Sequence, residues 1–275
     1  MKYLFAGLSI FIIIYTSKGQ TNPLDDMKFT EDVLYASTKQ VNQFFHRFNG
    51  EEDTKGNRLY DGDKNYRDPN LRKDYLINLF DLQNSNLDAP LVKEFIKEVI
   101  DKKNPKYIDL HDKELMAEAM ANFVYEGREV QLTLIFKLQR QAKGSEWVFD
   151  HVRFPALERT FKMDTTETKD FIHPMSHELD FMNLKKVLEN TQHPEQLTPR
   201  GFEPDILSIF LFEIKKGRLR FQSITNLKFH YLGLEDWYFE IAQFNRSGYN
   251  SGWLISNLVK ADKDQKLMLK EFIYD

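Results

Sequence analysis

Glu240 is the carboxylate whose sequence surroundings best suit catalysis. It lies within the range 237–244, where most side chains are apolar. A carboxylate enclosed by apolar side chains resists ionisation and is able to act as a general base. His230 and Tyr231 come shortly before it, on what we expect to be the neighbouring strand of the same unit. The three side chains therefore form a candidate site, with Glu240 as the weak candidate for the catalytic group.

The same stretch supports a second interpretation, in which Glu240 faces water. Trp237, Phe239 and Ile241 alternate along the chain, and such alternation predicts a strand with one buried face. If these three side chains fill the interior, Glu240 lies on the opposite side. The face that is buried therefore decides between an enzyme and a binding module.

Asp61, Asp63 and Asn65 have the oxygen spacing that opens a calcium-binding loop. The motif then fails, because Tyr66 stands where a glycine must turn the chain and Arg72 replaces the final glutamate. We therefore interpret these residues as an ordinary polar loop.

His173 and His177 stand four residues apart and are followed by Glu178 and Asp180. Histidines at this spacing share a helix face and are able to bind a metal ion. Pro174 indicates instead that a helix begins between them, and acids in a first helical turn are explained by the helix dipole. We predict no metal site and no cofactor.

An internal repeat organises the part of the chain that carries these residues. The ranges 123–129 and 229–235 both read F-x-Y-x-G-x-E and are 106 positions apart. The same offset carries Trp147 onto Trp253. Such self-similarity predicts a duplicated unit whose strands align without a gap, with two similar hairpins arising by chance as the alternative. We expect the two tryptophans to be buried at equivalent sites.

Periodicity predicts helices followed by strands in each half of the chain. Alternating apolar residues predict strands at 131–138, 147–154, 237–244 and 253–259, and a further strand ends in each F-x-Y motif. Helices are predicted at 30–48, at 71–82, from Asp88 onward and from Ser176 onward. The range 206–214 is so uniformly apolar that helix and buried strand are both open.

Helices followed by a curved antiparallel sheet resemble the nuclear transport factor 2-like family, a cone-shaped α+β fold. The stretches 173–178, 244–246 and 251–256 also resemble a group of exported bacterial proteins of unknown function. The resemblance implies an α+β fold class with two tandem cone-like units, each with helices followed by a curved antiparallel sheet. The superfamily includes isomerases, dehydratases and binding modules, so it implies no catalytic residue.

The first residues predict export. Lys2 precedes an apolar run from Tyr3 to Tyr15, and Ser17 and Gly19 supply the small residues that a signal peptidase requires. The run is short for a membrane span, and we expect no other segment to cross a membrane. The expected segments are a signal peptide at 1–19, linkers at 20–28 and 164–172, and α+β units at 29–163 and 173–275.

Composition narrows the partners. The chain of 275 residues has no cysteine, which closes disulfide and thiol chemistry. Removing Lys2 and Lys18 with the signal leaves 36 of the 38 basic residues against 42 acidic ones, a net charge of −6. An excess of acids disfavours nucleic acids and anionic membranes as non-specific partners.

We expect a periplasmic or extracellular, non-enzymatic module that binds a small apolar ligand or a protein partner. One alternative is an enzyme of the isomerase or hydro-lyase type that uses Glu240. Another is a structural subunit of an envelope assembly, which needs an exposed apolar patch instead of a cavity. Tyr125, Tyr231, His230 and Glu240 are the candidate ligand-binding residues. The sequence leaves the oligomeric state open.

Overall fold

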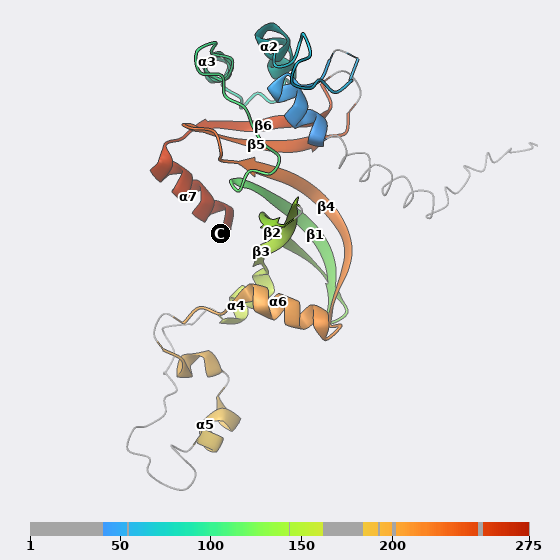
Figure 1. The fold of residues 1–275 in the computed structure, drawn as a ribbon. Coiled ribbons are helices and arrows are strands. Elements are labelled where there is room, and N and C mark those ends of the chain that lie inside the picture. Colours follow the sequence, from blue (N-terminus) through green and yellow to red (C-terminus); the bar gives the residue numbers. More distant parts are fainter. Residues whose placement is uncertain are drawn as a thin grey trace, which may run out of the picture.

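Six antiparallel strands in one curved sheet form the centre of the molecule (Figure 1). The computed structural model describes residues 41–53, 55–142, 144–161, 184–191, 193–199, 202–246 and 250–274. The strands are β1 (Leu115–Tyr125), β2 (Arg128–Gln141), β3 (Gly144–Arg153), β4 (Leu219–Tyr231), β5 (Trp237–Phe244) and β6 (Gly252–Lys260). The predicted α+β class is confirmed.

Helices precede, separate and follow the strands. Residues 41–49 form the described part of a first helix. The others are α2 (Pro69–Asn78), α3 (Ala89–Val99), α4 (Pro155–Phe161), α5 (Leu184–Asn190), the 3-10 helix Pro194–Leu197, α6 (Ile206–Lys215) and α7 (Lys263–Tyr274). The helix α3 begins directly after Asp88, as predicted, and the apolar range 206–214 is a helix. No periodicity argument predicted α7.

The sheet consists of two three-stranded halves that meet at β1 and β4. Its order is β3-β2-β1-β4-β5-β6, so each half is a meander, as predicted. All six strands nevertheless belong to one sheet, and two tandem cone-like units are not confirmed. The expected signal peptide at 1–19 and the linker at 164–172 lie outside the described residues.

The two halves correspond in their outer hairpins only. The pairs β2–β3 and β5–β6 each bulge at one extra residue, Asp150 and Ser256, which are 106 positions apart. The inner hairpins differ: Tyr125 pairs with Arg128 across a two-residue turn, whereas Tyr231 pairs with Phe239 and the five residues 232–236 connect the two strands. The prediction that the halves align without a gap is therefore wrong.

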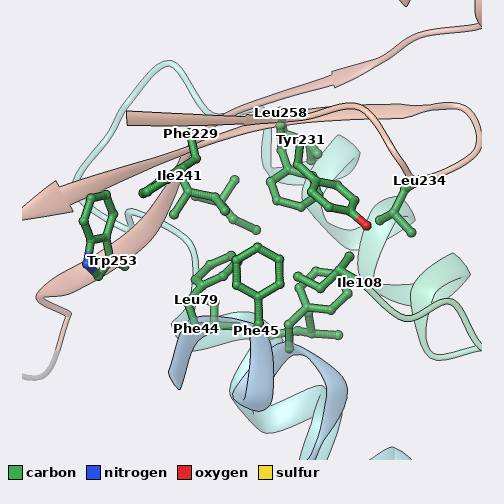
Figure 2. Packing of buried hydrophobic residues seen from close by; sticks show 14 of the residues in the cluster. Phe44, Phe45, Leu79, Ile108, Phe229, Tyr231, Leu234, Ile241, Trp253 and Leu258 are labelled. Atoms are coloured by element: carbon green, nitrogen blue, oxygen red, sulfur yellow. The ribbon is translucent and has the colours of Figure 1, made fainter. Parts of the chain in front are cut away.

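The first face of the sheet carries the main core. The first helix, α2 and α3 cover its β4–β6 side, and α4 and α6 cover its β1–β3 side. Figure 2 shows Phe44 and Phe45 of the first helix pointing toward Phe229, Tyr231 and Ile241 on the strands. Burying such side chains stabilises the fold by about 1.5–3 kcal/mol each.

The second face of the sheet is partly covered by α7. Met116, Ile135 and Tyr238 pack there against Ile273 of the helix. The outer side of α7 leaves Met268 64% exposed. Among the described residues, no helix is both long and apolar enough to cross a membrane.

Candidate functional site

The structure separates the four residues that the sequence analysis proposed as ligand-binding. Leu115 pairs with Tyr231, and Tyr125 pairs with Leu219, so the two tyrosines lie at opposite ends of the β1–β4 seam. Tyr231 is buried on the first face, where its hydroxyl donates to Asp112 at 2.9 Å. Burial and the Asp112 charge raise the pKa of Tyr231. Neither tyrosine shares a site with the other candidates.

His230 and Glu240 lie on the second face, in a chain of four hydrogen-bonded side chains. Nε2 of His230 lies 2.9 Å from the Glu118 carboxylate, and Nδ1 lies 2.8 Å from the Tyr238 hydroxyl. That hydroxyl donates to Glu240 at 2.9 Å. Trp237, Phe239 and Ile241, by contrast, are fully buried on the first face.

Basic side chains balance the two carboxylates of this polar chain. Arg153 lies 3.0 Å and Lys228 3.2 Å from Glu118, and Lys228 lies 3.7 Å from Glu240. Burial opposes the ionisation of Glu118, but the hydrogen bond with His230 and the charge of Lys228 outweigh it. Together they lower the pKa of Glu118 to about 2.

The polar chain is suited to holding the sheet together, because its members satisfy one another. His230 is 2% exposed, and both of its ring nitrogens have partners. A substrate would have to displace Glu118 or Tyr238 to reach the imidazole. Sequence reasoning missed both residues, although Glu118 stands out as a single acid among alternating alanines in the range 117–121.

A groove of about 680 Å³ runs between α2 and α3, which lie side by side at the top of Figure 1. This volume is within the range of small-molecule sites, about 300–1,000 Å³. Its apolar lining consists of Ile77, Phe80, Leu82, Leu87, Ala89, Val92, Ile96 and Ile100. Phe80 and Ile96 are buried in the floor, whereas Ile77 is 44% and Leu82 52% exposed. The groove therefore presents apolar surface to solvent.

The charges of α3 are divided between the sheet and the groove. Glu94 and Glu98, one turn apart, both accept from Lys260 of β6, at 2.6 and 3.3 Å. Glu98 also accepts from the indole N–H of Trp237 at 2.8 Å. Lys93 and Lys97 are likewise one turn apart, and they line the groove. The acids attach the helix to the sheet, and the lysines are left to the groove.

The groove is also fixed from the side of the α2–α3 connection. The carboxylate of Asp81, which lines the groove, accepts from Arg246 at 2.6 Å. Asn250 donates to the Phe80 carbonyl at 2.8 Å, and its amide oxygen accepts from the Leu82 N–H at 3.0 Å. These contacts join the connection to the end of β5 and the start of β6, so the groove is preformed.

A second cavity, of about 530 Å³, lies between α7 and the β4–β5 connection. The ammonium group of Lys266 donates to the backbone carbonyls of Leu232 and Leu234. Lys270 pairs with Glu114 at 2.6 Å. Two of the three lysines that line this cavity are therefore already engaged.

The two metal candidates from the sequence have different outcomes. The Asp63 carboxylate accepts from the Tyr60 N–H in a turn, as in an ordinary polar loop. His173, His177, Glu178 and Asp180 lie outside the described residues. Within the described ranges, no group of three or more acidic, histidine or cysteine side chains is placed to hold a metal ion.

Comparisons with known proteins identify no relative of this chain. No family model matches the chain, and neither the curated proteins nor the solved structures include a significant match.

Proposed function

We propose that the chain is a binding module whose α2–α3 groove takes a small apolar ligand. The observation that carries this proposal is the apolar lining of the groove, in which Ile77 and Leu82 are about half exposed. Leaving such side chains in water forfeits about 25 cal/mol for each Å² of apolar surface. A ligand that covers them recovers this free energy.

The enzyme alternative is less well supported at the same groove. Such a reaction needs an acid or base that reaches the bound molecule. Asp81 is the acid of the lining, and its carboxylate is held by Arg246 at 2.6 Å. Glu240, the original candidate, belongs to the polar chain on the second face of the sheet.

Export and tandem architecture remain parts of this proposal. The signal-like residues 1–19 support export to the periplasm or the cell exterior. The matched bulges at Asp150 and Ser256 support a duplicated unit of the nuclear transport factor 2-like kind. The differing inner hairpins mean that such a duplication has diverged most at the β1–β2 and β4–β5 connections.

The groove is tested with an uncharged apolar probe, N-phenyl-1-naphthylamine, whose fluorescence rises in apolar surroundings. We expect saturable binding to the unmodified chain and a loss of at least about tenfold in affinity for Ile77→Asp. Ile77 is exposed, so the fold should tolerate the change. Met268→Asp, an equivalent change on the outer side of α7, is the matched control and should bind like the unmodified chain. Equal binding by Ile77→Asp would refute the proposal.

A further inference from the structure

We infer that the ligand of the α2–α3 groove is a single-chain amphiphile with an anionic head group, an inference that rests on the proposed function. The apolar floor suits a hydrocarbon chain. Three lysines stand around it: Lys73 on α2, and Lys93 and Lys97 on α3. An anionic head group placed at their level pairs with the ammonium groups while the chain covers the floor.

The three lysines are free to make this contact. Within the described ranges none of them has an ion pair, whereas Lys106, Lys228, Lys260 and Lys270 all do. Asp81, the acid of the lining, is already neutralised by Arg246. The groove therefore carries a positive charge although the whole chain has a net charge of −4.

The positive charge of the groove favours a ligand with an anionic head group over a neutral ligand. Bringing lysines together around apolar surface leaves mutual repulsion that an anion relieves. Lys93 and Lys97 lie one turn apart on the same helix side, so one head group is able to contact both. A cationic head group would meet repulsion from all three.

The size of the groove favours a single chain over a partner helix. A helix about 10 Å wide and as long as α3, which has 11 residues, occupies about 1,300 Å³. The groove measures about 680 Å³, and the connection from Asp81 to Leu87 lines it beside the two helices. A hydrocarbon chain fits this space fully, whereas a helix would leave most of its surface outside.

The inference is tested with three probes that share one chain: dodecanoate, dodecanol and dodecyltrimethylammonium. Each is used below its solubility limit or micelle concentration to displace N-phenyl-1-naphthylamine from the full-length protein. We expect dodecanoate to bind at least about tenfold more tightly than dodecanol, and dodecyltrimethylammonium to bind most weakly. Equal affinity for all three would overturn the inference and leave the apolar site standing. Failure of all three to displace the probe would also overturn the inference, whereas the proposed function is decided separately by probe binding to Ile77→Asp.

Matched lysine variants locate the head group. Lys93→Gln/Lys97→Gln should lower dodecanoate affinity by about fivefold to tenfold, and adding Lys73→Gln should lower it further. Dodecanol binding should stay within about twofold. Lys215→Gln/Lys216→Gln removes the same charge at the end of α6 and should change neither affinity. Equal loss in both pairs would show that overall charge, not the groove, attracts the anion, and would refute the inference. Binding of an acidic amphipathic peptide to the groove, together with no binding of dodecanoate, would also refute the inference.

Discussion

Residues that are repeated in the two halves of the sheet lie in different surroundings. Trp253 lies near the start of β6, next to Gly252, and is 4% exposed, whereas Trp147, its match in β3, is 40% exposed. Both rings contact Phe229, at centroid distances of 5.2 and 5.9 Å. The two tryptophans therefore flank one phenylalanine, but a core encloses only one of them.

The difference comes from the helices that cover each half. The first helix, α2 and α3 pack over the side of the sheet that contains Trp253. The helices α4 and α6 pack over the other side, around Phe123 and Phe210, and they leave Trp147 at the edge of their cover. Sequence repetition thus specified strand order and bulges, while burial depended on helices that are not repeated. The expectation of two equivalent buried tryptophans is wrong for Trp147.

The largest test of this comparison is the removal of each tryptophan. Trp253→Ala should lower the free energy of unfolding by about 3–5 kcal/mol, because it leaves a cavity in the enclosed core. Trp147→Ala should lower it by about 1 kcal/mol or less, because much of that ring is already in water. Urea unfolding followed by circular dichroism measures both. Losses of similar size would show that the halves are equally enclosed.

A second test concerns the polar chain that crosses the seam between the halves. Glu118 comes from β1, and its partners His230 and Lys228 come from β4. Glu118→Gln keeps the shape but removes the charge, and should cost about 2–3 kcal/mol at neutral pH. Glu129→Gln, an exposed acid of the same half, is the matched control and should stay within about 0.5 kcal/mol.

The pH dependence of this effect has a defined sign. The pKa of Glu118 is lowered from its ordinary value of 4.5 to about 2 in the folded chain, so protons bind the unfolded chain more readily. The stabilisation is complete above about pH 4.5 and disappears as the pH falls toward 2. The difference between the unmodified chain and Glu118→Gln should shrink over that interval. A difference that stays constant would show that Glu118 contributes no charge-dependent stabilisation.

Local pattern predicted most strands, because both halves could be compared. Ala117, Ala119 and Ala121 favour a helix by propensity, but their counterparts Ser223 and Thr225 favour a strand, and both segments are strands. Sequence pattern no longer predicts the structure where contacts join residues that are far apart in the chain. Glu118 and His230 are 112 positions apart, and no local signal shows that β1 pairs with β4.

The groove was beyond sequence reasoning for a related reason. Its shape depends on how α2 and α3 pack and on Arg246, which reaches Asp81 from 165 positions away. One signal was present in the chain: Lys93 and Lys97 repeat with the helical period beside Glu94 and Glu98. Only the pairing of the two acids with Lys260 shows which charges remain free.

The smallest test concerns the matched glycines of the F-x-Y-x-G-x-E motifs. Gly127 has φ +81° in the tight β1–β2 turn, with nothing within 4 Å of an added Cβ. It is needed for its backbone conformation, so Gly127→Ala should cost about 1–2 kcal/mol and Gly127→Asn less, because Asn tolerates positive φ. Thermal unfolding of both variants measures this order.

Gly233 is needed for space instead, and this predicts the opposite order of substitutions. A Cβ there would lie 2.1 Å from Oδ2 of Asp112 and 3.0 Å from the Tyr231 hydroxyl. Gly233→Ala should therefore break the 2.9 Å hydrogen bond between them, at a cost of about 1–3 kcal/mol, and Gly233→Asn should be no better. Because the clash is with Asp112, adding Gly233→Ala to Asp112→Ala should cost almost nothing more. Additive losses in that double variant would mean that the two glycines share one role, and that the halves differ less than their contacts indicate.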